Sequence, residues 1–326
     1  MKKLMVIPLV AAGMAAMVGC SKTPVKEAAK NDAINLANLD TAVAPGTDFY
    51  QYACGGWMKN NPLKPEYARF GTFDQLRDNN QEQIRTLIEG LSETPGQEGS
   101  VGQKIGMLFA MGMDSVKLNE DGYAPIKDQL AEINKLGTKD ELTKMVATLH
   151  KEGMAPFFAL YVGADEKNSS MNIVQLYQAG LGMGDRDYYL LEDESSQKMR
   201  EAYKNYITRL FTLIGSSPEQ ADAAVNAIMK IERGIAEVSF SREDLRDSQK
   251  NYNKMSIEGF KAKNDLLNWD VYFESMGMMD IKYLDAKQLS FYEGLSALMK
   301  NTTLDEQKYY LTFNLLSSAA PYPVSY

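Results

Sequence analysis

The sequence has 326 residues, a formal net charge of −8, 44% hydrophobic residues, two cysteines and one histidine. This length and hydrophobic content are sufficient for a sizeable core, arranged as one large domain or two. The negative charge and the lack of a concentrated basic stretch argue against a nucleic-acid-binding protein, because contacts to phosphates require clustered lysine and arginine.

The start of the chain resembles a bacterial lipoprotein signal. Two lysines follow Met1, residues 4–18 form an apolar run that is short for a membrane span, and Met17-Val-Gly-Cys20 places small residues before a cysteine. We expect residues 1–19 to be a signal peptide and residues 20–40 to be a flexible tether, with the lipid on Cys20. The protein would then be anchored by its lipid in the cell envelope, at the outer membrane or cell surface of a bacterium. An ordinary secretory signal with a chance cysteine is the alternative.

The segment Asp48 to Trp57, DFYQYACGGW, combines four aromatic residues with a cysteine and two adjacent glycines. Because Gly55-Gly56 interrupts the aromatic residues, we expect a short turn of helix that ends in a tight bend. Cys54 is expected to be unpaired within this chain, since Cys20 would carry the lipid.

Helix signals dominate the rest of the chain. Capping boxes, in which the side chains of the first and fourth residues cap a helix start, are expected at Thr72–Gln75 and Thr138–Glu141. Thr303–Glu306 is expected to cap another helix, and Ser217–Gln220 to open one with Pro218 at its first position. Apolar residues at helical spacing follow them, and Gly153 and Gly215 are placed to end two helices. Residues 157–162 and 173–178 flank a polar turn and predict a β-hairpin. The fold class is therefore mainly α with one small β-hairpin.

No metal site or nucleophile can be assembled from local patterns. A His-Glu-x-x-His zinc site needs two imidazoles one helical turn apart, and His150 is the single histidine. We expect His150 to be a structural residue, at the surface or half-buried, rather than a ligand. The run Gly180-Leu-Gly-Met-Gly184 has neither the lysine of a P-loop nor the spacing of a Rossmann loop, so we do not interpret it as a phosphate site.

Three ordered motifs resemble a known family. They are Asp48–Trp57 with Arg69-Phe-Gly-Thr-Phe-Asp74 and Leu76-Arg77-Asp78, then Gln178–Leu190, then Tyr310–Tyr322. Together they are similar to the neprilysin-like M13 zinc metallopeptidases, which include endothelin-converting enzymes and PepO-type peptidases. The sequence departs from the family in two places: Pro45-Gly-Thr47 stands where many relatives have a cysteine, and Gly184 replaces a proline.

The resemblance implies a fold and a separate function for each domain. In relatives, the His-Glu-x-x-His zinc site lies in a carboxy-terminal half, which this chain does not contain, and a helical domain limits which peptides reach the zinc. By this resemblance, residues 41–78 pack on the absent catalytic domain, and residues 79–326 are an incomplete helical cap domain. Residues 48–57 would form the anchor between the cap domain and the catalytic domain. Zinc is expected in the full-length relative and no cofactor in this chain.

The resemblance also implies a substrate-binding role for Arg69, with Asp74 completing its motif. A guanidinium can hold a peptide carbonyl or carboxylate with two parallel hydrogen bonds. The alternative is that Arg69 pairs with a structural carboxylate. For the whole chain we expect the substrate-restricting part of a cell-envelope zinc metalloendopeptidase, inactive alone, whose partners are the catalytic half and peptides. The alternative is a non-catalytic helical surface lipoprotein that captures peptide or glycan.

Overall fold

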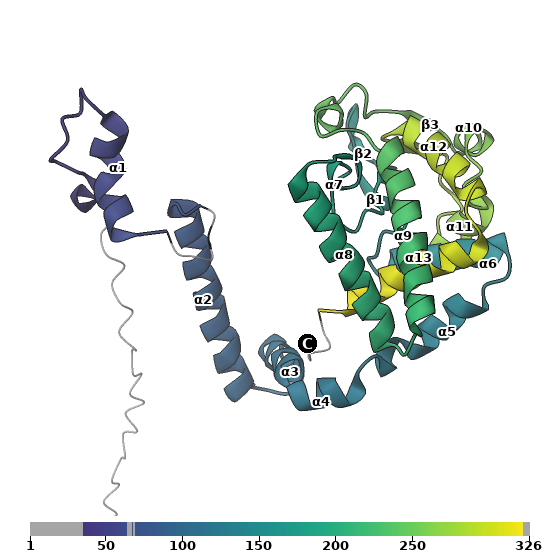
Figure 1. Cartoon of the computed structure of the whole chain (residues 1–326), viewed down its shortest axis with the longest axis horizontal. Coiled ribbons are helices and arrows are strands. Elements are labelled where there is room, and N and C mark those ends of the chain that lie inside the picture. The colour runs from purple at the N-terminus through teal and green to yellow at the C-terminus, as the bar shows by residue number, and fades with distance from the viewer. Residues whose placement is uncertain (1–34, 64–66, 68, 322–326) are drawn as a thin grey trace, which may run out of the picture. The chain divides into compact units, whose positions relative to one another are not determined.

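The computed structural model describes residues 35–63, 67 and 69–321, so the expected signal peptide and Cys20 lie outside the described residues. The chain divides into two compact units, one ending at Gly90 and the other starting at Leu91. The described part is mainly helical, with thirteen α-helices and one small sheet (Figure 1), which confirms the fold class. Within the described ranges, no helix is both long and apolar enough to cross a membrane.

The first unit begins with the 3₁₀ helix η1 (Leu36–Asn38) and α1 (Phe49–Asn60), followed by α2 (Thr72–Glu93), which reaches into the second unit. Helix α1 starts at an Asp48 cap and continues through Gly55 and Gly56, so the expected tight bend is wrong. The glycines instead allow close packing of the chain around η1. A Cβ at Gly56 would lie 2.4 Å from the carbonyl oxygen of Ala37.

The expected capping box at Thr72 is also wrong, because Thr72 is already the first residue of α2. The side chain of Asp74 accepts a hydrogen bond from the backbone N–H of Gly71 at 3.0 Å. A carboxylate in the first helical turn is favourable there, since it faces the positive end of the helix dipole. The helix therefore starts one residue earlier than the pattern suggests, with Asp74 in place of Gln75 as the side chain that reaches back.

The second unit contains the remaining helices. They are α3 (Val101–Met113), α4 (Ser115–Asp121), η2 (Ala124–Ile126), α5 (Lys127–Lys135), α6 (Lys139–Lys151), α7 (Asp187–Leu190), α8 (Glu194–Leu213), α9 (Pro218–Val238), η3 (Asp244–Arg246), α10 (Ile257–Lys263), α11 (Trp269–Met276), α12 (Leu289–Lys300) and α13 (Leu304–Ala319). The helix starts expected at Thr138, Ser217 and Thr303 are present, and each is a capping box. Gly153 and Gly215 have left-handed backbone angles just after α6 and α8, as expected of helix ends.

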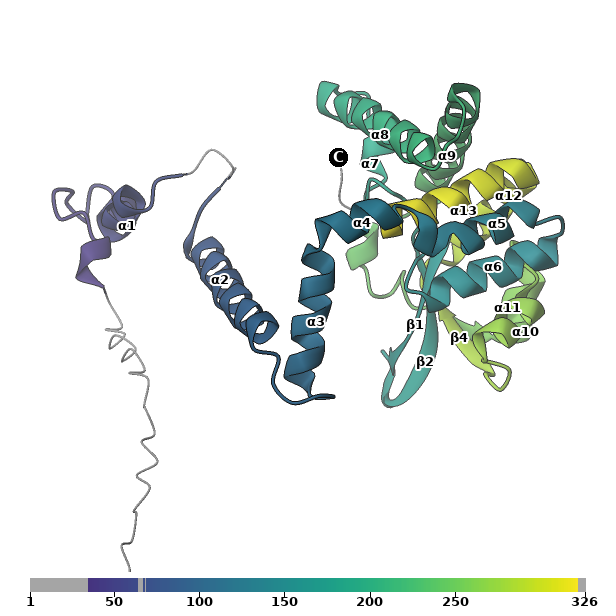
Figure 2. The same cartoon turned by 90° about the horizontal axis from the view of Figure 1, so that it is seen from below.

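The expected hairpin is confirmed and belongs to a larger sheet. Strands β1 (Phe158–Asp165) and β2 (Asn168–Gln178) pair in antiparallel fashion. Two short strands that the sequence patterns did not indicate, β3 (Lys254–Ser256) and β4 (Tyr283–Ala286), complete the order β1-β2-β4-β3, with β4 parallel to β2. The β1–β2 turn projects beyond the helices (Figure 2), and the residues near it are exposed.

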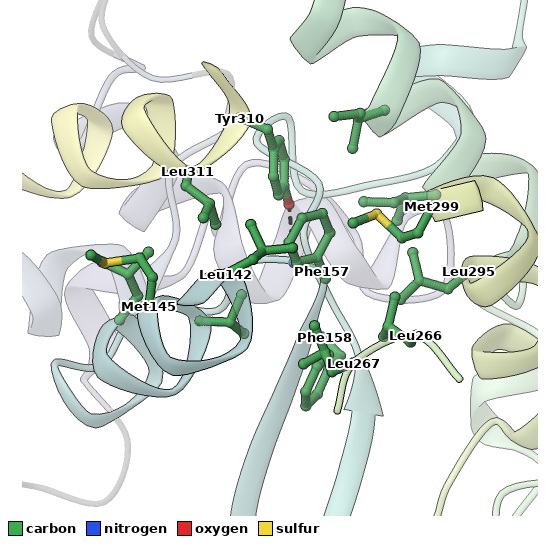
Figure 3. Close-up of a cluster of buried hydrophobic side chains, with 14 of the residues drawn as sticks. Leu142, Met145, Phe157, Phe158, Leu266, Leu267, Leu295, Met299, Tyr310 and Leu311 are labelled. Atoms are coloured by element: carbon green, nitrogen blue, oxygen red, sulfur yellow. Dashed lines mark hydrogen bonds between the residues drawn. The ribbon is translucent and has the colours of Figure 1, made fainter. Parts of the chain in front are cut away.

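The core of the second unit lies between the sheet and the helices around it. Helix α9 packs against α8, α12 and α13, and α6 packs against α11 (Figure 2). Figure 3 shows side chains from α6, α12 and α13 meeting the start of β1. Phe157 and Phe158 are fully buried there, and Phe157 has the left-handed φ of 67°. A hydrogen bond from its backbone N–H to the hydroxyl of Tyr310, at 3.2 Å, helps to hold this strained residue.

Candidate functional site

The first candidate site is the segment that enters α2, where Arg69 and Asp74 lie. Asp74 is half-buried, and its two oxygens are already engaged. One accepts from Gly71 N at 3.0 Å and the other from the Arg77 guanidinium at 3.1 Å. Asp74 therefore fixes the helix start and orients Arg77, and the structure does not bring its carboxylate to Arg69 as a hydrogen-bond partner.

Arg77 is the centre of this cluster, although the sequence motif that contains it predicts no site role for it. It contacts Asp74, lies 3.4 Å from Asp78 and sits 5.7 Å from the ring centre of Tyr67. The Tyr67 hydroxyl donates to the other oxygen of Asp78 at 2.7 Å, and this bond raises the pKa of Tyr67. The signal that could have found Arg77 is its spacing, three residues after Asp74 on a predicted helix.

Arg69 is exposed, and within the described residues it makes no hydrogen bond or ion pair. The carboxylates nearest in sequence on α2, Asp74 and Asp78, are engaged by Arg77 and Tyr67. Next to Arg69, the ring of Phe70 stacks on Trp57 with 6.0 Å between centroids. The guanidinium is thus carried on a segment held by aromatic contacts, while its own donors point to no described partner. Cys54 lies half-buried in α1 and is a free cysteine.

A second constellation lies in the second unit, where the glycine run after β2 meets α9 and α13. The hydroxyl of Tyr310 donates to the carbonyl of Gly180 at 2.8 Å. A Cβ at Gly180 would lie 2.7 Å from that hydroxyl, and its φ is +96°, so glycine is required there. The glycine-rich motif and the Tyr310 motif, more than a hundred residues apart, are thereby joined.

Glu232 of α9 lies beneath the same loop. It is 1% exposed, and its carboxylate accepts from Tyr189 OH at 2.6 Å, Tyr203 OH at 2.9 Å and Gly182 N at 3.3 Å. Burial raises the pKa of Glu232 to about 7. The Cβ of any residue in place of Gly182 would lie 1.8 Å from the Tyr203 hydroxyl, so the loop approaches the carboxylate only because it lacks a side chain here.

This network borders a cavity of about 640 Å³. The glycine loop and Glu232 line it on one side, and α13 contributes Asn314, Ser317 and Ser318. A cavity of this size is within the range that holds small ligands or peptide side chains. The glycine run is therefore a structural loop that covers a buried carboxylate.

His150 has the structural role that the sequence analysis expected. Its Nδ1 lies 2.6 Å from the Tyr272 hydroxyl, and its Nε2 lies 3.1 Å from the carbonyl of Pro156. A carbonyl can only accept, so Nε2 carries the proton and Nδ1 accepts from the tyrosine. Burial lowers the pKa of His150 to about 4.

The described residues do not fit a zinc site. No group of three or more histidine, cysteine, aspartate or glutamate side chains is placed among them to hold a metal ion. The single histidine has both nitrogens engaged, as the preceding distances show, and carboxylates alone favour harder cations than zinc. No chemical step at a metal can be assigned to this part of the chain.

Comparison with known proteins gives one consistent result. Residues 45–325 match the model described as Peptidase family M13. Endothelin-converting enzyme 1 from Mus musculus is 29% identical over 347 residues, covering 98% of this chain and 44% of the relative. The Bos taurus enzyme of the same name is 32% identical over 245 residues, covering 72% of this chain and 31% of the relative.

Solved structures agree on the fold. The zinc metalloprotease ZMP1 of Mycobacterium tuberculosis, in complex with an inhibitor, matches with a TM-score of 0.78 and 24% identity, over 89% of this chain and 44% of that one. PepO from Lactobacillus rhamnosis matches with a TM-score of 0.68 and 20% identity, over 85% of this chain and 44% of that one. The chain thus spans less than half the length of these relatives.

Proposed function

Because the chain belongs to peptidase family M13, we propose that it is the N-terminal, helical and substrate-restricting part of a zinc metalloendopeptidase of the cell envelope. The observation that carries the proposal is the match over residues 45–325 combined with coverage of only 31–44% of the relatives named above. Cleavage of peptides would require a catalytic half that supplies the zinc ligands. Zinc is therefore a cofactor of the assembled enzyme and not of this chain.

Exposed apolar side chains in the first unit support a partner of this kind. Phe49 and Tyr50 of α1 are 69% and 67% exposed, and Phe73 and Leu87 of α2 are 88% and 65% exposed. Large apolar side chains that are this exposed on two helices favour an interaction surface. The proposed occupant is the catalytic half, with DFYQYACGGW as part of the interdomain anchor.

For Arg69 we propose binding of a peptide carbonyl or terminal carboxylate in the assembled enzyme. Its exposure and its lack of a partner among the described residues favour this role over a structural ion pair. Asp74 supports the segment indirectly, because its bonds to Gly71 and Arg77 fix the start of α2 directly after Arg69. Its own contact with substrate remains part of the proposal.

The deciding experiment begins with the coding sequence downstream of codon 326 in the source genome. A His-Glu-x-x-His there supports the proposal, and its absence favours a non-catalytic lipoprotein that captures peptide or glycan. The encoded catalytic half, expressed separately, should regain peptide cleavage when this chain is added. In that enzyme Arg69→Ala should raise KM about tenfold or more, as for loss of a charge-assisted hydrogen bond, with an unchanged melting temperature. Arg85→Ala, at an exposed i,i+4 pair on α2, is the matched control.

Anchoring through Cys20 is the localisation part of the proposal. It rests on the lysines, the apolar run and the lipobox-like sequence at the start of the chain. Mass spectrometry of membrane-associated protein should find an acylated amino terminus at Cys20, and Cys20→Ser should abolish it. A soluble mature protein that starts at another residue would refute this part.

A further inference from the structure

Glu232 is a buried carboxyl group that forms no ion pair with any of the described residues. Its three hydrogen-bond donors, Tyr189, Tyr203 and the Gly182 amide, are all neutral. None of the ion pairs formed by the described residues includes it, and its neighbour Arg233 pairs with Glu237 instead. Buried charges in proteins are normally paired, because a low-dielectric surrounding penalises an isolated ion.

The carboxylate also has unused acceptor capacity, and Glu232 is one of the residues that line a cavity. An ionised carboxylate offers about four acceptor positions. Oε1 of Glu232 receives two donors and Oε2 receives one, so Oε2 retains a position. Glu232 lines the cavity of about 640 Å³ described above, together with Asn314, Ser317 and Ser318. The cavity thus combines a negative charge with neutral amide and hydroxyl groups.

We propose that this cavity binds an organic cation, the ammonium or guanidinium group of a lysine or arginine side chain, with Glu232 as its counter-ion. Such a group would supply the missing positive charge and would donate a hydrogen bond to the open acceptor position at Oε2. A role of Glu232 limited to clamping the glycine loop would give no preference for a cation. The inference goes beyond the proposed peptidase function, and its test needs no catalytic half, so either can fail without the other.

Near neutral pH, the charge state of Glu232 should control how tightly the cavity binds a cation. Burial raises the pKa of Glu232 to about 7, and the pKa values of Tyr189, Tyr203 and Tyr310 are raised as well. These tyrosines therefore stay neutral while Glu232 titrates. The nearby loop residue Asp185 is paired with Arg242. A bound cation should be held more tightly above pH 7 than below it.

The test compares two probes on the full chain by isothermal titration calorimetry. Nα-acetyl-lysinamide carries the ammonium group, and Nα-acetyl-norleucinamide has the same aliphatic stem without it. At pH 8 we expect the lysine compound to bind at least about tenfold more tightly, the gain typical of a hydrogen bond between charged groups. This advantage should shrink at pH 5.5, where Glu232 is protonated.

Two variants test whether the preference for the lysine compound depends on Glu232. Glu232→Gln keeps the side-chain shape and should abolish the preference for the lysine compound. Glu237→Gln removes an exposed charge from the same helix and should leave it intact. Equal binding of the two probes to the wild-type chain, absence of binding, or a preference that survives in Glu232→Gln would overturn the proposal. If Glu232→Gln does not fold, a wild-type preference that is unchanged between pH 8 and pH 5.5 overturns it equally.

Discussion

His150 is held as a neutral imidazole by two hydrogen bonds and by aromatic neighbours. Its ring packs edge-on against Phe158 and Tyr272, with centroids 4.7 Å and 5.7 Å away. The folded pKa of about 4 lies below the ordinary value of 6.5, so the unfolded chain takes up a proton first as the pH falls. The stability contributed by this group is present above pH 6.5 and is lost as the pH falls through 4, a change of about 3 kcal/mol.

The titration of His150 can be followed directly, because the chain has one histidine and therefore one imidazole signal. The Cε1 proton resonance should keep its chemical shift from pH 7.5 to 5.5 and move only at about pH 4. Tyr272→Phe removes the hydroxyl that donates to Nδ1 and leaves Pro156 as the remaining partner. A midpoint near 6.5 in the folded wild-type chain would show that the imidazole is solvated, contrary to the buried position described here.

Sequence reasoning names candidate residues only where the information is local, and it misses those that depend on distant partners. Arg69 and Asp74 belong to one short motif and were named from it. Glu232 lies on α9 four residues after Ile228 and three before Ile235, so helical spacing puts it on the apolar face, but that spacing does not show which groups its carboxylate contacts. Its donors Tyr189 and Tyr203 are 43 and 29 residues away, so only the folded chain brings them together.

At the scale of elements, the same distinction explains which predictions held. The capping boxes at Thr138, Ser217 and Thr303 span four residues each, and their local chemistry decides the helix start. Strands β3 and β4 have three and four residues and pair through long-range contacts, so no alternating pattern could reveal them. The prediction of a bend in α1 is wrong because it assumes that adjacent glycines mark a flexible backbone. In α1 the glycines instead allow close packing.

The packing role of Gly56 leads to a prediction. Alanine normally stabilises a helix interior by about 1 kcal/mol relative to glycine. At Gly56, however, the added Cβ would lie 2.4 Å and 2.7 Å from the carbonyl oxygens of Ala37 and Leu39, which are backbone atoms. We expect Gly56→Ala to destabilise the packing of η1 on α1 by about 1–3 kcal/mol, the usual cost of overpacking.

Gly90 provides the matched control for this prediction, since it lies in α2 with nothing within 4 Å of a Cβ. Gly90→Ala should stabilise the chain slightly, by about 0.5–1 kcal/mol. Hydrogen exchange of the amides around η1 and α1 should report the loss in Gly56→Ala and not in Gly90→Ala. Equal or greater protection in Gly56→Ala would mean that η1 does not pack on α1 as closely as described.

At the scale of the whole molecule, each unit presents apolar helices that its own core does not cover. In the second unit α3 carries Val101, Leu108 and Met111 at 73%, 72% and 66% exposure. Burial of such surface stabilises an assembly by roughly 25 cal/mol per Å². A partner that covers this surface is expected to stabilise the chain.

The last prediction concerns the chain without that partner. Zinc hydrolysis requires about three protein ligands with an open coordination position, and a base for the attacking water. One histidine with both nitrogens engaged does not meet that requirement. We expect purified residues 21–326 to contain no stoichiometric zinc by elemental analysis and to leave fluorogenic peptides uncleaved, while the catalytic half restores both. Peptidase activity that is sensitive to chelators, co-purifies with this chain alone and persists after contaminants are removed would contradict the division of labour between the two halves. The metal site would then have to be formed by carboxylates that lie at the surface or in ion pairs.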